Sequence, residues 1–370
     1  MCLETPPSDT KKMKTGLTTG ACAAACSKAA VLCLLEGKKI KNVEINLPGG
    51  KTASFKIENC ESAGNSATAT TVKNAGDDPD VTHGAVIGCS VSLNNTGEIR
   101  FTRGKGVGKV TLPGLGIETG EPAINTVPRK MMSRIVKGLL KENGRGGEGA
   151  EIKVFVPEGA KLAKKTLNSR LGIEGGISII GTTGIVRPFS AASYVASIVQ
   201  AVKICSENGC GKVVASSGGR SEKYLKKQFP GLPDYAFIQY GNWIGRLLDA
   251  AEREGIQDLT LATMLGKAVK LAGGDMDTHS GKTLWDKEVA ARAAEKCGAR
   301  EAADRIRKLN IARRLTEIFP LSGGEPFYVE LLKQCRKHCA QRFSGVLRLA
   351  LVGTDGQIVW YPETEDADNG

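Results

Sequence analysis

The sequence contains few aromatic residues and few histidines. Only 5% of its 370 residues are Phe, Trp or Tyr, and 3 are histidine. Proteins that bind single-stranded nucleic acid commonly stack bases on aromatic side chains that lie among basic residues. Here the net charge is +12, but the Lys and Arg residues are spread along the chain with few aromatics among them. This pattern argues against a nucleic-acid partner and favours a small substrate that carries several carboxylates or phosphates.

The sequence has no C-x-x-C pair, although it contains 11 cysteines. Three of them lie in an Ala-rich run, which predicts packing within a helix (Cys22, Cys26 and Cys33). The one Cys/His cluster lacks a second pair of ligands, so we expect no protein-bound metal (Cys335, His338 and Cys339). Cysteines without a pattern are typical of a reducing compartment, and we expect a cytoplasmic protein.

Long hydrophobic runs are also missing. Met1 to Lys14 has no apolar core, which predicts that there is no export signal and that residues 1–12 form a loose leader. The longest uncharged run, Val81 to Gly97, is polar and shorter than the roughly 20 apolar residues of a membrane span. We therefore expect no membrane partner.

Neither common nucleotide-binding signature occurs. Gly181 to Gly184 reads G-x-x-G rather than G-x-G-x-x-G, and no G-x-x-x-x-G-K-[ST] is present. These absences argue against a dinucleotide-dependent dehydrogenase and against a P-loop enzyme.

Glycine is abundant, with 46 residues, and it separates short segments of two kinds. Up to about residue 170, the segment from Thr15 to Glu36 reads as a turn that leads into a helix, with Thr18 or Thr19 as the cap and Gly37 as the end of the helix. Alternating strand-like segments follow it. Another amphipathic helix is expected from Pro128 to Lys141. Residues 1–170 therefore read as an α+β domain.

From residue 171 the pattern becomes apolar run, small-residue turn and helix, repeated four times, which is typical of a parallel sheet. Helices are expected over 191–207, 221–228, 244–254 and 267–271, followed by a helical region over 287–318. A final hairpin turns at Asp355-Gly356, and we expect residues 362–370 to be disordered. Residues 171–370 are thus expected to form a parallel α/β domain.

The four turns that follow the apolar runs are a candidate ligand site, because ligands of open parallel sheets lie beyond the carboxyl ends of the strands. The alternative is that their glycines only make tight turns. The turns contain Gly181, Thr182, Thr183 and Gly184; Ser216, Ser217, Gly218, Gly219 and Arg220; Gly241 and Asn242; and Gly266 and Lys267.

The segment from Asn74 to Ala85 is dense in polar residues. Asp77, Asp78 and Asp80 flank a proline and precede His83, which suits an acid/base loop facing the substrate or, alternatively, a solvated turn. His279 lies in a similar segment, Gly273 to Lys282, which is either a second functional loop or a helix cap.

The segment from Arg103 to Arg129 contains six glycines and reads as a long mobile loop over an anion, or as a glycine-rich hairpin. Its basic residues are candidates for binding carboxylates (Arg103, Lys105, Lys109 and Arg129).

Several long motifs resemble the cobalt-precorrin-5B C(1)-methyltransferase family of anaerobic cobalamin biosynthesis. They occur in order over residues 12 to 355: "KTGLTTGACAAACSKAA", "VKNAGDDPDVTHGA", "GKGVGKVTLPGL", "GEPAINTVPR", "TLNSRLGIEGGISIIGTTGIVRP", "YGNWIG", "GKAVKLAGG" and "DTHSGK". Ser169 stands where the family pattern has proline, and Cys22 and Cys26 stand where alanine is usual.

The resemblance implies a fold and a reaction. The first domain would resemble a permuted form of the second domain of a small-subunit ribosomal protein, followed by a small parallel α/β domain. The reaction would move a methyl group from S-adenosylmethionine to carbon 1 of a cobalt-containing tetrapyrrole, giving cobalt-precorrin-6A. Such a ring carries many carboxylates, which suits a charge of +12. A kinase-like enzyme that uses phosphate or nucleotide and a nucleic-acid-binding protein are the alternatives.

Within that reaction we expect three groups of residues. The methyl donor would lie at Gly181 to Gly184, Ser217 to Gly219 and Asn242. The tetrapyrrole would contact Arg103, Lys105, Lys109, Arg129 and His279, while Asp77, Asp78 or His83 would accept a proton from the ring.

Overall fold

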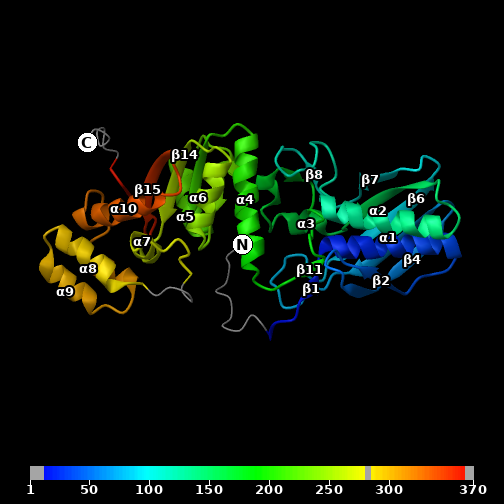
Figure 1. Cartoon of the computed structure of the whole chain (residues 1–370), viewed down its shortest axis with the longest axis horizontal. Coiled ribbons are helices and arrows are strands. Elements are labelled where there is room, and N and C mark those ends of the chain that lie inside the picture. The colour runs from blue at the N-terminus through cyan, green and yellow to red at the C-terminus, as the bar shows by residue number, and fades with distance from the viewer. Residues whose placement is uncertain (1–11, 280–284, 363–370) are drawn as a thin grey trace. The chain divides into compact units, whose positions relative to one another are not determined.

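The computed structural model describes residues 12–279 and 285–362. The chain divides into two compact units, unit 1 up to Ser190 and unit 2 from Ala191 (Figure 1). Segment 171–190 therefore belongs with the first unit, whereas the sequence predicted a boundary at residue 170. Most of the expected leader and C-terminal tail lies outside the described residues.

Unit 1 is built on a five-stranded sheet in the order β4-β5-β6-β9-β7. Its neighbours are antiparallel except for β7 and β9, which run parallel. The strands are β4 (Asn59–Ala63), β5 (Ser66–Val72), β6 (Val86–Asn94), β7 (Ile99–Arg103) and β9 (Gly149–Phe155), and β2 (Asn42–Asn46) pairs separately with β3 (Thr52–Lys56). The period-2 segments predicted from the sequence are thus strands, while β4 was not predicted.

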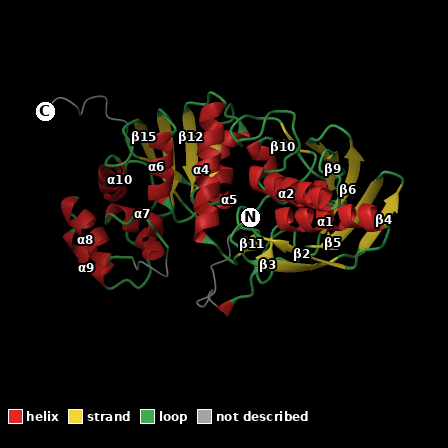
Figure 2. Cartoon of the chain, turned by 45° about the vertical axis from the view of Figure 1, so that its right-hand side comes forward, coloured by secondary structure: helices red, strands yellow, loops and turns green. Residues whose placement is uncertain are grey.

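Two helices cover this sheet, α1 (Thr19–Glu36) and α2 (Thr126–Glu142), and they lie side by side (Figures 1 and 2). Thr18 caps α1 and Gly37 ends it in the left-handed conformation, as the sequence predicted. By length and hydropathy α1 could cross a membrane, but 72% of it is buried inside the protein, as expected of a core helix. Its Ala and Cys residues allow the close packing.

The remaining elements of unit 1 are short. β1 (Gly16–Leu17) pairs with β11 (Ile185–Val186), and β8 (Lys109–Val110) pairs with β10 (Ile173–Glu174). A short helix and a 3-10 turn complete the unit, α3 (Gly159–Ala163) and η2 (Asn168–Leu171). These pairings tie residues 103–125 and 173–186 to the rest of unit 1.

Unit 2 contains a second five-stranded sheet, in the order β13-β12-β14-β15-β16. β12 (Lys212–Ser216), β13 (Phe237–Gln239), β14 (Asp258–Thr263) and β15 (Val346–Val352) are parallel, and β16 (Ile358–Trp360) is antiparallel, forming the expected hairpin. β12 precedes β13 and β14 in the sequence, and these two strands pair with its two edges, so the strand order reverses at β12. In doubly wound sheets this switch point is where ligands bind.

Helices cover both faces of this sheet. α5 (Gly219–Gln228) packs on Val214, Phe237 and Ala262, while the other face holds Val213, Ala215 and Leu261 in a larger core. That core also contains residues of α4 (Ala191–Glu207), α6 (Ile244–Arg253), α7 (Leu265–Ala272), α8 (Lys287–Lys296), α9 (Arg300–Arg307), α10 (Pro326–Cys339) and η4 (Ala312–Glu317), with η3 (Asp234–Ala236) before β13. The predicted mixed α/β class is confirmed.

One predicted strand is absent from the parallel sheet. Residues 177–184 lie in unit 1, where Ile177 and Ile179 make single bridges to Val107 and Ile124. The expectation of four strand-end turns in one sheet was therefore wrong, and three remain. Apolar runs of this length resemble buried strands, but here the run is buried against the glycine-rich segment of unit 1.

Candidate functional site

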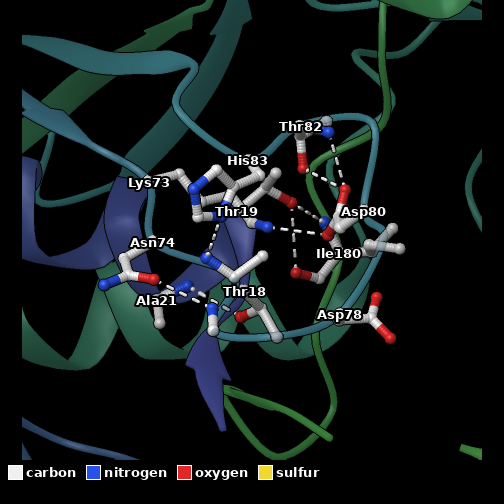
Figure 3. A network of polar contacts seen from close by, with 12 residues as sticks. Thr18, Thr19, Ala21, Lys73, Asn74, Asp78, Asp80, Thr82, His83 and Ile180 are labelled. Atoms are coloured by element: carbon white, nitrogen blue, oxygen red, sulfur yellow. Dashed lines mark hydrogen bonds and ion pairs between the residues drawn. The ribbon is translucent and has the colours of Figure 1, made fainter. Parts of the chain in front are cut away.

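The first motifs of the chain meet at the start of α1 (Figure 3). Thr18 Oγ1 accepts the Ala21 N–H at 3.1 Å, which caps the helix. The Ile180 N–H donates to Thr19 Oγ1 at 2.9 Å, and the Gly20 N–H donates to the Ile180 carbonyl at 2.9 Å. The start of α1 is thus held to a segment about 160 positions along the chain.

Two glycines allow this close approach. A Cβ on Gly181, whose φ is +136°, would lie 2.2 Å from Thr18 Oγ1. A Cβ on Gly16 would lie 2.0 Å from the carbonyl carbon of Ala75. A side chain at either position would push the two contacting segments apart. These glycines are therefore needed for close packing as well as for the backbone conformation.

The Asn74–Ala85 segment lies on the other side of the N-terminal strand. The Leu17 N–H donates to the Asn74 carbonyl at 2.7 Å, and Asp77 exchanges two bonds with the backbone of Lys14. Asn74 Oδ1 accepts the Gly76 N–H at 2.8 Å, which forms a local turn. Three motifs that are distant in sequence therefore form one surface.

A buried ion pair fixes the middle of this segment. Lys73 is 1% exposed, and its Nζ lies 2.7 Å from Asp80 Oδ2. The other oxygen, Asp80 Oδ1, accepts both the N–H and the hydroxyl of Thr82. Burial opposes ionisation of Asp80, but Lys73 and Thr82 outweigh it, so the pKa of Asp80 is lowered. Asp80 is therefore ionised and structural.

His83 is exposed, and its ring orientation is fixed. Nδ1 accepts the Ala75 N–H at 3.2 Å, which requires this nitrogen to be unprotonated. The neutral ring then carries its proton on Nε2, so the nitrogen that remains available is a hydrogen-bond donor. This geometry makes His83 better suited to contacting a substrate oxygen than to taking up a proton.

The two other candidate acids differ in their surroundings. Asp77 is exposed and bonds the backbone of Lys14. Asp78 is half-buried, and its Oδ1 accepts the Phe189 N–H at 3.0 Å. Burial raises the pKa of Asp78 although the Phe189 N–H opposes this effect. A carboxylate with a raised pKa is a better proton acceptor, which singles out Asp78 among the three predicted residues.

Cys22, which lies in α1, is not a nucleophile at neutral pH. Burial raises the pKa of the Cys22 thiol to about 12, so it stays protonated. Cys22 lines a pocket of about 240 Å³ together with residues that include Lys56, Glu58 and Asn74. This volume is below the 300–1,000 Å³ or so of ligand pockets and suits part of a ligand, such as one ring substituent.

The glycine-rich segment is tied down by backbone bonds rather than forming a free loop. Gly108 donates to Ile177, Ala123 to Gly108 and Asn125 to Ile179. Arg103, Lys105 and Lys109 expose their side chains. Arg129 differs, because its guanidinium bonds Glu121 Oε2 and the carbonyls of Pro122 and Ile124 and lies over the Phe101 ring. Its donors hold the segment together.

Unit 2 has its own candidate site at the switch point. Ser216 is the last residue of β12, Ser217 and Gly218 follow it, and the Ser216 carbonyl accepts the Tyr240 N–H at 2.9 Å. The turn after β13, Gly241-Asn242, lies beside the helix that follows β14, because Lys267 Nζ donates to the Gly241 carbonyl at 2.7 Å and to Asn242 Oδ1. The ends of β12 and β13 are thus adjacent, and the turn after β13 contacts the start of the helix after β14. Gly181, Thr182, Thr183 and Gly184, in contrast, belong to unit 1.

The motif around His279 joins the same site. The Thr278 N–H donates to the Asn242 carbonyl at 2.9 Å, Lys270 Nζ donates to the Thr278 carbonyl at 3.2 Å, and Asp277 forms a bridge with Trp243. The His279 N–H donates to Asp277 Oδ1 at 3.3 Å. The "YGNWIG", "GKAVKLAGG" and "DTHSGK" motifs are therefore one cluster, as far as residue 279.

Cys335 and Cys339 are buried in the core of unit 2, and Cys335 Sγ donates to the Ala268 carbonyl. No group of three or more His, Cys, Asp or Glu side chains suited to a metal ion occurs among residues 12–279 and 285–362. The two cysteines of the cluster seen in the sequence thus pack in the core.

Sequence reasoning missed Lys73 and Lys270. The alternation of β5 carries a signal for the first, since Ala67, Ala69, Thr71 and Lys73 occupy the same buried face. Lys270 lies three positions after Lys267, a helical spacing that places both side chains on one side of α7.

Comparisons with known proteins agree along the chain. The sequence model of the CbiD family matches residues 7–188, and that described as "CbiD, C-terminal domain" matches residues 277–363. A cobalt-precorrin-5B C(1)-methyltransferase of Priestia megaterium is 46% identical over 89% of this chain and 90% of its own length. One from Geobacillus sp. (strain WCH70) is 42% identical over 97% and 99%. A solved cobalamin biosynthesis protein (cbiD) from Archaeoglobus fulgidus is 25% identical, covers 73% of this chain and 83% of its own, and has a TM-score of 0.39.

Proposed function

The chain belongs to the CbiD family and is a C-methyltransferase, and we propose that it transfers a methyl group from S-adenosylmethionine to carbon 1 of cobalt-precorrin-5B, giving cobalt-precorrin-6A. The observation that carries this proposal is the similarity to cobalt-precorrin-5B C(1)-methyltransferases along nearly the whole chain. The cobalt belongs to the substrate.

The chemistry requires alignment more than a strong base. The electron pair of the ring carbon forms the new bond to the methyl carbon, and the methyl–sulfur bond breaks toward the sulfonium, which leaves as neutral sulfide in S-adenosylhomocysteine. The positive charge of the donor disperses in this step, so the methyl transfer itself requires a site that aligns both substrates and excludes water. The sites described above contain no activated nucleophile, which is consistent with direct transfer.

The switch point of unit 2 is the proposed site of the methyl donor. Ser217, Gly218, Gly219 and Asn242 lie there, at the position where doubly wound sheets bind nucleotide-like ligands. Gly181 to Gly184 lie in unit 1 beside Thr18, and we assign them to the surface at the start of α1.

The tetrapyrrole is proposed to contact the exposed cations of unit 1. Arg103, Lys105 and Lys109 can each bind a ring carboxylate, whereas Arg129 supports the segment that carries them. His279 remains a proposed contact from unit 2. Asp78 is the favoured acceptor of the ring proton, ahead of Asp77 and His83, because burial raises the pKa of Asp78.

A direct assay tests the proposal. Purified protein, cobalt-precorrin-5B and S-adenosylmethionine are incubated without oxygen, and the product is examined by mass spectrometry and NMR. We expect the ring to gain one methyl group at carbon 1, with release of S-adenosylhomocysteine. A methyl group at another ring carbon, or ATP consumption in place of methyl transfer, would refute the proposal. We also propose that the enzyme is cytoplasmic.

A further inference from the structure

Lys267 occupies a central position in the unit 2 site. It lies in the first turn of α7, directly after β14, and reaches across to the turn that follows β13. Its Nζ donates to the Gly241 carbonyl at 2.7 Å and to Asn242 Oδ1. Gly241 has a φ of +61°, and this left-handed turn directs its carbonyl toward the lysine.

The two acceptors use only two of the three N–H groups of an ammonium. A neutral amine would make the same two bonds, so they do not by themselves explain a charged residue here. The third N–H can donate a hydrogen bond to a ligand oxygen. Lys267 is only partly exposed, so a ligand that accepts this bond replaces solvent in a confined site.

The charged groups nearby come from three elements. Lys270 lies on α7, Asp275 and Asp277 lie in the segment after it, and His338 on α10 lies against Gly274. Lys270 Nζ donates to the Thr278 carbonyl, so it supports the segment that carries Asp277. Two lysines therefore lie on one side of a short helix at the switch point, beside the two carboxylates of the segment that follows the helix.

We propose that Lys267 binds a carboxylate group of one of the two substrates at the switch point of unit 2. The proposal rests on the methyl-transfer function proposed above. Both substrates supply this chemistry, since the methyl donor has an amino-acid tail and the tetrapyrrole has acetate and propionate side chains. Asn242, held by the same lysine, would orient the bound group.

The protonation of Lys267 supports this role. Burial lowers its pKa to about 8, with Lys270 acting in the same direction and Asp277 opposing both. A bound carboxylate favours the ammonium form, so binding should weaken as pH rises through about 8. A lysine that served only to hold Gly241 and Asn242 would not give this pH dependence, because the neutral amine keeps both bonds.

A matched set of ligands tests the proposal on the full chain. S-adenosylhomocysteine carries the amino-acid tail, methylthioadenosine lacks it, and cobyrinic acid is a corrinoid with free side-chain carboxylates. We expect Lys267→Gln to weaken either S-adenosylhomocysteine or cobyrinic acid about ten- to a hundredfold, the range for a hydrogen bond to a charged group. Binding of methylthioadenosine should be unchanged. The ligand that is affected identifies the source of the carboxylate.

The control variant is Lys203→Gln, which removes a partly exposed lysine of α4 that pairs with Glu207 and should alter no affinity. If Lys267→Gln does not fold, the rate of acetylation of Lys267 in the wild-type protein is measured instead. S-adenosylhomocysteine or cobyrinic acid should then slow the acetylation of Lys267, and methylthioadenosine should not. The proposal is overturned if neither carboxylate ligand loses affinity and neither protects Lys267. If the assay shows no methyl transfer while a carboxylate ligand depends on Lys267, the function is wrong and the site is right.

Discussion

At the scale of residues, the buried ion pair of unit 1 stabilises the fold and is not part of the proposed chemistry. Lys73 is almost fully buried, and its partner Asp80 also bonds Thr82. The pair holds the segment that carries Asp78 and His83. Removing one partner of a buried pair leaves the other charge without compensation, which is more costly than losing a surface pair.

We expect Lys73→Met to reduce the free energy of unfolding by about 2–3 kcal/mol, somewhat below the range for fully buried pairs because Asp80 is 25% exposed. Denaturant unfolding measures the effect. The control Lys39→Met breaks an exposed pair with Glu61 and should cost at most about 1 kcal/mol. Equal losses in the two variants would contradict a structural role for Lys73.

The same pair predicts an acid sensitivity. The folded protein lowers the pKa of Asp80 below its ordinary value of 3.8, so the stabilisation is fully present above that pH. It is lost as pH falls below 3.8 and through the lowered pKa. Asp80→Asn should therefore lose stability at pH 7 but show a smaller further loss between pH 4 and 2 than the wild type. Parallel acid curves for both proteins would argue against the pair.

Proton acceptance can be tested with variants that keep the hydrogen bonds. In Asp78→Asn the amide oxygen still accepts the Phe189 N–H, and in His83→Asn it can replace Nδ1 as acceptor of the Ala75 N–H. We expect turnover to fall about a hundredfold or more in Asp78→Asn and less than tenfold in His83→Asn. His83→Ala within a few-fold of wild type would exclude an essential base there. A greater loss of turnover in His83→Asn than in Asp78→Asn would make His83 the proton acceptor.

Sequence reasoning identified these polar residues but not their division of labour. The density of Asp77, Asp78, Asp80 and His83 was visible, yet exposure and bonding partners separate one structural carboxylate from one chemically suited one. Those depend on Lys73, Ala75 and Phe189, which the fold brings to the segment. Periodicity predicts which face a residue occupies and does not predict its partners.

At the scale of elements, close backbone contacts explain much of the glycine content. Gly16 lies in β1 against Ala75, Gly181 lies against Thr18, and a Cβ on Gly176 would lie 2.1 Å from the Gly106 carbonyl oxygen. These contacts join the segments 14–21, 74–85, 103–125 and 173–186 into one layer next to the capped start of α1.

A matched pair of glycine substitutions tests this layer. Gly16→Ala should separate β1 from Ala75 and reduce both stability and turnover. Gly138→Ala lies within α2, where an added Cβ meets no atom within 4 Å, and should stabilise the protein by about 0.5–1 kcal/mol. Thermal unfolding and turnover are measured for both. A Gly16→Ala enzyme with wild-type turnover would show that this contact is dispensable for the site.

The glycine-rich segment gives a second test at this scale. We expect Lys105→Gln and Lys109→Gln to raise KM for the tetrapyrrole several-fold each while the melting temperature changes little, since both side chains are exposed. Arg129→Lys should lower the melting temperature, because lysine cannot make the four hydrogen bonds of Arg129. If Arg129→Lys raises KM and leaves the melting temperature unchanged, Arg129 contacts the substrate instead.

Element prediction succeeded where a pattern was local and failed where it was not. Thr18 and Gly37 mark the ends of α1 by their own chemistry, and the limits of α4 match the predicted helix 191–207. Residues 177–184 were assigned to the parallel sheet because a short apolar run has the same composition in either unit. Its partners, Val107 and Ile124, lie far away in the sequence.

At the scale of the whole molecule, each unit has its own core. The core of unit 1 is formed by α1, α2 and the β4–β9 sheet, and that of unit 2 by the parallel sheet with its helices. The predicted α+β and parallel α/β parts correspond to these units. The position of their boundary followed from the contacts of 173–186 rather than from any composition change.

This division allows the methyl donor to be located in the intact enzyme. Hydrogen–deuterium exchange with and without S-adenosylhomocysteine compares the backbone of both candidate sites at once. We expect slower exchange at 216–221, 240–245 and 264–270, because turns after β12, β13 and β14 that contact a ligand open less often. Segments 15–21, 74–85 and 177–184 should be unaffected by this ligand and should respond to cobyrinic acid. Protection by S-adenosylhomocysteine confined to the unit 1 segments would move the donor to the start of α1, where Thr18 and Gly181 meet, and would leave the switch point of unit 2 to the carboxylates of the ring.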